Sequence, residues 1–146
     1  MREIKFRGKR LSNGEWVYGD LCCHYENQRR FIACDQMFYT HAECGIERLV
    51  SERFHEVDPA TVGQHTGLKD KGGQEIYEGD IVRFSDNPIH AGTIAVCKWL
   101  DWRVGFVYKI ISGDYKGKYT DMADTWRKYE VIGNIHDNPE IGRAHV

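Results

Sequence analysis

Short stretches in which apolar and polar residues alternate recur along the chain, and a period of two predicts β-strands. Residues 3–7 (EIKFR) alternate in this way. Residues 15–23 (EWVYGDLCC) follow after a turn built on Asn13 and Gly14, a pair that favours tight hairpin turns. The two stretches therefore predict a β-hairpin, and residues 29–35 (RRFIACD) predict a third short strand.

A second hairpin is predicted over residues 66–84 (TGLKDKGGQEIYEGDIVRF). Its turn begins at Lys69, and Gly72 or Gly73 supplies the positive φ that the turn requires. Gly79 marks another tight turn, and we expect Asp80 to cap it, because aspartate accepts hydrogen bonds from nearby backbone N–H groups. Further strands are predicted over residues 92–100, 103–111 and 129–135.

Other segments have a less regular pattern. The stretch DPATVG predicts a short helical turn, with Asp58 as N-cap and Pro59 at the first helical position. Residues 37–57 fit either strands broken by loops or one short helix over residues 42–50. Residues 121–128 fit a single helical turn.

Short strands with turns spaced by about 8–12 residues predict a mainly β protein that contains a small barrel or sandwich. We place a β-rich N-terminal region at residues 1–57 and a small β domain at residues 58–140. The stretch EIGRAHV (residues 140–146) reads as the translation of a short sequencing adapter. We therefore expect residues 141–146 to be a non-native tail and leave them out of the fold prediction.

Charge and composition indicate which partners and which cellular compartment fit this chain. The 146 residues carry 20 Lys and Arg against 22 Asp and Glu, so the net charge of -2 gives no global attraction to nucleic acid. No apolar run approaches the ~20 residues that span a bilayer, and no apolar segment follows the charged N-terminus as in a signal peptide. Five cysteines without paired spacing fit a reducing compartment. We expect a cytoplasmic protein without membrane contact.

Three segments, in this order, resemble the YopX family of phage and prophage proteins: REIKFRGKRLSNGEWVYGDL, VDPATVGQHTGLKDKGGQEIYEGDIV and YEVIGNIHDNPE. The resemblance implies a C-terminal small barrel of the Src-homology-3 type behind a β-rich N-terminal part, and an origin in a phage or prophage of a bacterial host. It implies no reaction, ligand or cofactor, so no functional residue carries over. Gly72 and Gly73 stand where the family has Asn-Gly, which changes only the chemistry of the turn.

Cysteine and histidine are frequent near the end of the N-terminal region, at Cys22, Cys23, His24, Cys34, His41 and Cys44. Structural zinc uses four nitrogen or sulfur ligands, usually with paired C-x₂-C spacing. Cys22 and Cys23 are adjacent, so in a strand they point to opposite faces and do not serve one metal easily. We expect no metal site and no cofactor.

Catalytic motifs are missing from the sequence, among them G-x-S-x-G, H-E-x-x-H and the glycine-rich nucleotide motifs. Four acids fit turn positions better than general acid–base chemistry: Asp70, Glu75, Glu78 and Asp80. His55 and His65 flank the DPATV turn without a recognisable nucleophile nearby. We expect a protein that is not an enzyme.

The N-terminal hairpin offers one candidate binding surface. If Ile4 and Phe6 face the core, Lys5 and Arg7 face solvent, and Trp16 and Tyr18 lie on the partner strand. Cations beside exposed aromatic rings suit single-stranded nucleic acid. The alternative is that these cations protect an edge strand from unwanted pairing.

The C-terminal hairpin offers a second candidate surface, with Trp99, Trp102, Phe106 and Tyr108 around one turn. Small barrels bind peptides through aromatic grooves, and they also need aromatic rings to fill a small core. We expect Trp102 and Tyr108 to be exposed and available for binding.

These observations favour a phage accessory protein that works as a protein-interaction or assembly module. Its partner would be an unknown host or phage protein, or a second copy of the chain. Exposed strand edges at residues 92–100 and 103–111 would provide the contact. The alternative is a nucleic-acid-binding protein that uses the basic N-terminal strand, and a steep salt dependence of binding would distinguish it.

Overall fold

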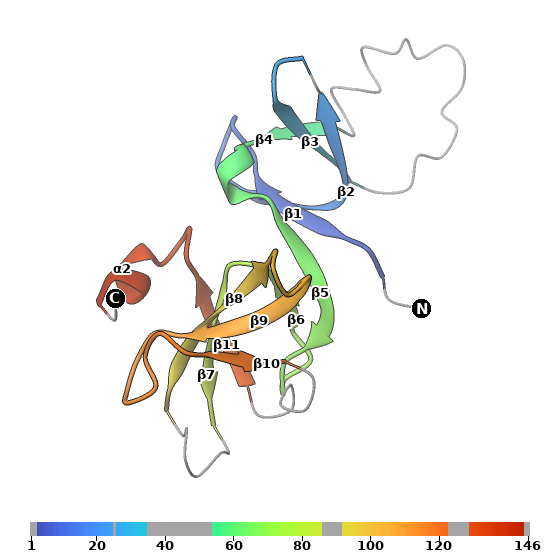
Figure 1. The fold of residues 1–146 in the computed structure, drawn as a ribbon. Coiled ribbons are helices and arrows are strands. Elements are labelled where there is room, and N and C mark those ends of the chain that lie inside the picture. Colours follow the sequence, from blue (N-terminus) through green and yellow to red (C-terminus); the bar gives the residue numbers. More distant parts are fainter. Residues whose placement is uncertain (1–2, 25, 35–53, 86–91, 123–128, 145–146) are drawn as a thin grey trace, which may run out of the picture. The chain divides into compact units, whose positions relative to one another are not determined.

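The computed structural model describes residues 3–24, 26–34, 54–85, 92–122 and 129–144 (Figure 1). The protein is mainly β, as predicted, and its strands form antiparallel sheets. The chain divides into two compact units, Met1–Gln64 and His65–Val146, whereas the sequence places the boundary between Val57 and Asp58. In the described part of the chain, no helix has the length and apolar character needed to cross a membrane.

The first unit supplies four curled strands, in the order β4-β3-β2-β1, to a six-stranded antiparallel sheet, and β1 also pairs with the segment at Gly63 and Gln64. Its strands are β1 (Phe6–Lys9), β2 (Trp16–His24), β3 (Arg29–Ala33) and β4 (Phe54–Val57). The predicted Asn13-Gly14 turn joins β1 to β2, with Gly14 at φ 72°. Beyond β1, Arg10 forms an isolated bridge with Val57, and the Asp58 N–H donates to the Lys9 carbonyl over 2.8 Å. The end of β4 therefore returns to the end of β1.

The inside of this curl holds the fully buried apolar residues found among the described part of the first unit. Ile32 and Val57 are fully buried. A Cβ placed on Gly8 would lie 2.9 Å from the Val57 Cβ, so only glycine allows β1 to approach β4 this closely.

A short 3₁₀ helix, η1 (Pro59–Thr61), follows β4. Asp58 is its N-cap, and the Asp58 carboxylate accepts a 3.0 Å hydrogen bond from the Ala60 N–H. Pro59 occupies the first helical position, as the sequence predicts. The Thr61 hydroxyl accepts from the Lys9 N–H over 2.9 Å and thereby ties η1 to β1.

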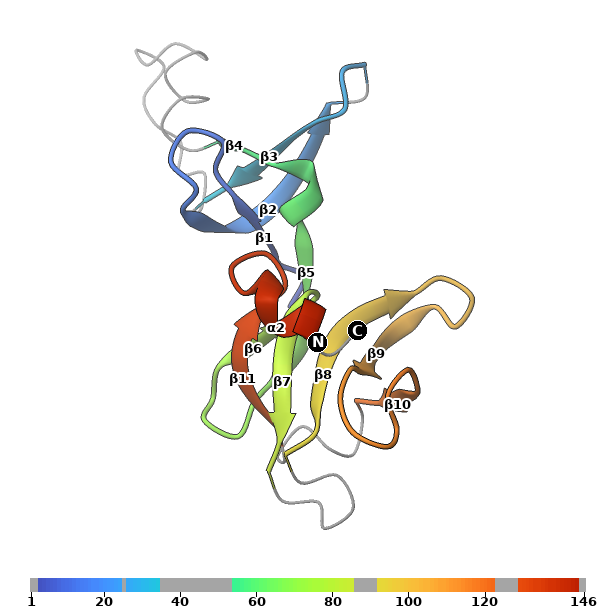
Figure 2. The ribbon, with the colours of Figure 1, turned by 90° about the vertical axis from the view of Figure 1, so that its left-hand side faces the viewer.

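The second unit is built on a five-stranded sheet in the order β10-β9-β8-β7-β11 (Figure 2). Its strands are β7 (Asp80–Phe84), β8 (Ile94–Leu100), β9 (Gly105–Ile110), β10 (Tyr119–Asp121) and β11 (Tyr129–Asn134). β5 (Gly63–Lys69) begins in the first unit and continues into a hairpin with β6 (Glu75–Tyr77). Pairing among the described strands leaves the five-stranded sheet open, and a Src-homology-3 type barrel stays a prediction.

Both faces of the five-stranded sheet are covered by apolar packing. On one face the buried cluster includes Val82, Ala95 and Tyr108, together with Ile76 of β6. On the other face Ile81, Val96 and Ile111 form a second cluster, against which Ile94, Ile132 and Ile141 pack. Ile141 belongs to α2 (Pro139–Ala144), so this short helix covers part of that face. The non-native origin expected for residues 141–146 stays a prediction.

The prediction that residues 92–100 and 103–111 present exposed strand edges is wrong. β8 and β9 pair with each other, from the Ala95–Ile110 pair at one end to the Leu100–Gly105 pair at the other. In addition, β8 pairs with β7, and β9 pairs with β10. Their backbone groups are therefore used within the sheet, whose outer strands are β10 and β11 among the described residues. The alternatives for residues 37–53 and the helical turn at residues 123–128 lie outside the described residues, and residues 54–57 form β4.

Candidate functional site

The tip of the β8–β9 hairpin presents two large apolar side chains to solvent. Trp102 is 76% exposed and Val104 is 75% exposed. We call these two residues the tip cluster. The Val104 backbone has φ 52°, a left-handed conformation that costs a β-branched residue about 1–3 kcal/mol. The hairpin therefore holds an apolar side chain in a strained position that faces water.

Side chains at the base of the hairpin brace the tip cluster. The Trp99 Nε1–H donates to the Asp101 carboxylate over 2.9 Å, and the Trp99 ring packs edge-on against Phe106 with centroids 5.0 Å apart. Arg103 pairs with Asp121 of β10. These contacts lie on both sides of the turn, so they limit the number of conformations that the tip can adopt.

Tyr108 does not belong to this surface, and the prediction that it is exposed is wrong. Its side chain is fully buried, with its ring edge-on to Tyr129 at 4.5 Å and to Phe84 at 6.1 Å between centroids. Tyr108 pairs with Cys97 across β8 and β9, on the face that carries the main apolar cluster. Trp102 is exposed as expected, but its part in binding stays a prediction.

The basic strand of the first unit differs from its predicted form in one important respect. Arg7 is only 5% exposed, so the prediction that it faces solvent is wrong. Its guanidinium lies 4.6 Å from the centroid of the Trp16 ring, a cation–π contact that accounts for part of this burial. Lys5 lies 3.9 Å from the Glu3 carboxylate, so its charge is partly compensated.

Lys9, one of the basic residues clustered at the N-terminal end of the sequence, also belongs to this surface. It lies directly opposite Trp16 in the β1–β2 register, and its ammonium is 5.7 Å from the ring centroid. The register of the Asn13-Gly14 hairpin could have revealed this pair, because residues opposite each other share one face. Tyr18, two residues along β2, is 46% exposed.

Two of the four acids assigned to turns, Asp70 and Asp80, accept hydrogen bonds from backbone N–H groups. Asp70 is 5% exposed, and its carboxylate accepts hydrogen bonds from the N–H groups of Gly72, Gln74 and Val131. Gly73, at φ 87°, completes the turn. Across the second turn, where Gly79 has φ 90°, the Asp80 carboxylate accepts from the Tyr77 N–H over 2.7 Å. These contacts explain why acids stand at these positions.

Four members of the cysteine and histidine set lie in the described part of the chain: Cys22, Cys23, His24 and Cys34. Cys22 and Cys23 are adjacent on β2 and so face opposite sides, and Cys34 follows β3. Burial raises the pKa of the Cys22 thiol, with further contributions from Asp20 and Cys23, so this thiol is less ready to become a metal-binding thiolate. His24 is exposed, while His41 and Cys44 lie outside the described residues.

The two histidines beside the DPATV turn occupy different environments. His65 is 4% exposed and packs against the Tyr77 ring with centroids 5.2 Å apart. His55 is half-buried on β4. Burial, followed by the positive charge of Arg10, lowers the pKa of the His55 imidazole. Arg10 belongs to the same basic cluster of the sequence, but its approach to His55 was not predicted, because β4 and the β1–β2 turn are far apart in the chain.

Comparison with known proteins identifies a structure with a similar fold and the family to which the chain belongs. The crystal structure of protein EF1440 from Enterococcus faecalis is similar, with a TM-score of 0.54 and 23% sequence identity over 97% of this chain and 99% of that chain. This likeness supports the fold alone. No curated protein matches the chain. Residues 5–141 match the family described as YopX protein, and the chain therefore belongs to the YopX family.

Proposed function

We propose that this YopX protein is a non-catalytic interaction module that inserts the tip cluster into an apolar pocket of another protein. The observation that carries the proposal is the exposure of Trp102 and Val104, at 76% and 75%, two residues apart on one hairpin. Tryptophan is enriched among the residues that dominate binding energy at protein interfaces. The partner is a protein of the bacterial host or of the phage, met in the cytoplasm.

The braces at the base of the hairpin support this proposal. Binding costs free energy when flexible side chains and loops must become ordered. The bonds from Trp99 to Asp101 and from Arg103 to Asp121 supply that order before a partner arrives. The left-handed backbone of Val104 is consistent with a functional site, because strained residues cluster at such sites.

A photo-crosslinking experiment tests the proposal. The photoreactive residue p-benzoylphenylalanine replaces Trp102 in one protein and Tyr115 in a matched control, because Tyr115 is a 39% exposed aromatic residue of the same unit. Each purified protein is irradiated in bacterial lysate, and the products are identified by mass spectrometry. We expect position 102 to give one specific product that excess unlabelled protein competes away.

A second change separates specific insertion from general stickiness. Val104→Asp places a charge beside the crosslinker and should remove the product from position 102. A product formed equally from positions 102 and 115, or one that survives Val104→Asp, would rule out insertion of the tip cluster. A crosslink to a second copy of the chain would mean that the tip cluster mediates self-assembly and does not bind a different protein.

Nucleic-acid binding is the alternative, and one arrangement favours it. Lys9, Trp16 and the 46% exposed Tyr18 lie on one face of β1 and β2. Such a surface combines a cation with stacking platforms for single-stranded bases. Because Arg7 is buried, the informative variants are Lys9→Glu and Tyr18→Ala, measured by fluorescence anisotropy with single-stranded DNA across a salt series. Binding that these variants leave unchanged would exclude this face.

A further inference from the structure

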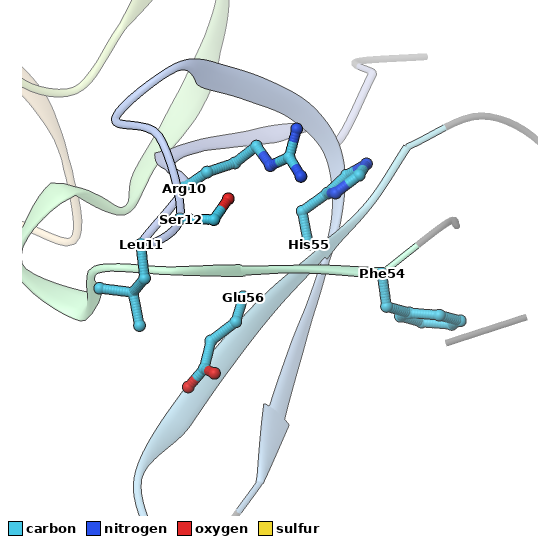
Figure 3. Close-up of a pocket in the computed structure, with 6 residues that line it drawn as sticks. All are labelled: Arg10, Leu11, Ser12, Phe54, His55 and Glu56. Carbon is cyan, nitrogen blue, oxygen red and sulfur yellow. The ribbon is translucent and has the colours of Figure 1, made fainter. Parts of the chain in front are cut away.

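A pocket of about 340 Å³ opens in the first unit between the β1–β2 turn and β4 (Figure 3). Its lining residues come from two short segments: Arg10, Leu11, Ser12, Phe54, His55 and Glu56. The walls are fixed by the backbone, since the Leu11 N–H donates to the Glu56 carbonyl over 3.0 Å and Arg10 bridges to Val57. The pocket is therefore a property of the fold and not of side-chain positions alone.

Two nitrogen-rich side chains converge on one side of this pocket. Figure 3 shows the Arg10 guanidinium extending toward the His55 imidazole, with the Ser12 hydroxyl on the same side of β4. Leu11 and Glu56 point to the opposite side. Among the described residues, no carboxylate lies within ion-pair distance of the Arg10 guanidinium, which makes Arg10 unlike the neighbouring Arg29.

Among the described residues that line the pocket, Glu56 is the one carboxylate, and it is already engaged. Glu56 accepts hydrogen bonds from Arg29 at 2.8 and 2.7 Å, in a two-point contact that also lowers the pKa of the Glu56 carboxyl. Opposite His55 on β3 stands apolar Ile32. Among the described residues, the charged group that faces His55 is therefore Arg10, and burial together with this charge disfavours the imidazolium.

We propose that Arg10 and His55, with the Ser12 hydroxyl, bind an anionic group of the carboxylate or phosphate class. The guanidinium offers a planar pair of donors that matches both groups, and the imidazole adds another donor when it is protonated. An anion between the two bases removes the repulsion that opposes protonation of His55. Binding should therefore raise the pKa of His55 and tighten as the imidazole gains its proton.

Nuclear magnetic resonance on the full chain tests this site. The His55 ring signals are followed against pH in sodium chloride, in inorganic phosphate and in sodium acetate, all at one ionic strength. We expect the His55 pKa to be higher in phosphate, in acetate or in both than in chloride, and the arm that responds names the chemical source. Equal pKa values in all three solutions would overturn the proposal.

Two variants make the assignment specific. Arg10→Gln should weaken binding of the responding anion by about tenfold to a hundredfold, the effect of losing one charge-assisted contact. The matched control is Arg83→Gln, which removes an arginine paired with Glu130 on the second unit and should leave binding unchanged. Equal affinities for Arg10→Gln and the wild-type chain would assign the effect to surface charge and overturn the site. This inference is independent of the tip cluster.

Discussion

The ring and the hydroxyl of Tyr108 stand in different situations, because the ring is packed and the hydroxyl is buried without a hydrogen-bond partner among the described residues. The ring touches Phe84 and Tyr129 in the main apolar cluster of the second unit. Among the described residues, the buried hydroxyl has no hydrogen-bond partner. Burial is also the main reason why the pKa of this phenol is raised far above its ordinary value.

We predict opposite outcomes for two substitutions at this residue. Tyr108→Phe keeps the ring and removes a buried polar group without an acceptor, so the free energy of unfolding should stay equal or rise by up to about 1 kcal/mol. Tyr108→Ala leaves a cavity and should lower the free energy of unfolding by about 3–5 kcal/mol. Urea denaturation followed by tryptophan fluorescence measures both. A loss above about 1 kcal/mol in Tyr108→Phe would mean that the hydroxyl is bonded.

The misassigned exposure of Tyr108 has a physical cause. Alternation along residues 105–110 predicts a strand and says which residues share a face, but it does not say which face will be covered. That choice depends on Leu68 and Ile76, which pack on this face from the β5–β6 hairpin. Arg7 was misassigned in a similar way, because its contact with Trp16 depends on a ring from the next strand.

At the scale of the element, the Asp70 carboxylate adds side-chain hydrogen bonds to the backbone bonds that close the β5–β6 turn. One oxygen of Asp70 accepts from Gly72 and Gln74 at 2.9 Å each, and the other accepts from Val131 of β11 at 3.0 Å. The Lys71 N–H also donates to the Tyr129 carbonyl over 3.0 Å. The turn and the edge strand β11 are therefore joined through both Asp70 and Lys71.

We predict that Asp70→Asn destabilises the protein by about 1–3 kcal/mol, because the new amide nitrogen faces a backbone N–H that has lost its acceptor. Asp114→Asn is the matched control, since Asp114 is exposed in the loop after β9. Urea denaturation of both variants gives the comparison. If the free energies of unfolding of the two variants differ by less than about 0.5 kcal/mol, the hydrogen bonds to Asp70 do not contribute to stability.

Elements whose chemistry is local were predictable from the sequence. The Asn13-Gly14 turn, the Asp58-Pro59 start of η1 and the turn at Gly73 all rest on residues with known backbone preferences. The return of β4 to β1 was not predictable, because it pairs residues 10 and 57, which are distant in the chain. The Arg10–His55 pocket depends on that return, which explains why sequence reasoning did not find it.

At the scale of the whole molecule, the two units bury separate sets of side chains. Ile32 and Val57 are buried in the first unit, while both apolar clusters of the second unit consist of residues after Gln64. The family match spans residues 5–141 and the structural likeness covers 97% of the chain, so both matches include residues of both units. Separate burial raises the question of whether the units unfold together.

Gly8→Ala addresses this question because it overfills the first unit alone. The added Cβ would lie 2.9 Å from two carbons of the stiff Val57 side chain, and overpacking of this kind costs about 1–3 kcal/mol. We predict faster amide hydrogen exchange in β1, β2 and β3, with β7, β8 and β9 as protected as in the wild-type chain.

The control for this experiment is Gly105→Ala, where the nearest atom to the new Cβ, the Arg103 carbonyl oxygen, is 3.9 Å away. Exchange in that variant should stay close to wild type in both units. Equal acceleration of β1–β3 and β7–β9 in Gly8→Ala would mean that the chain unfolds as one cooperative body. Acceleration confined to the first unit would mean that each buried set sustains its own unit, and that variants of Arg10 and of Trp102 can be interpreted separately.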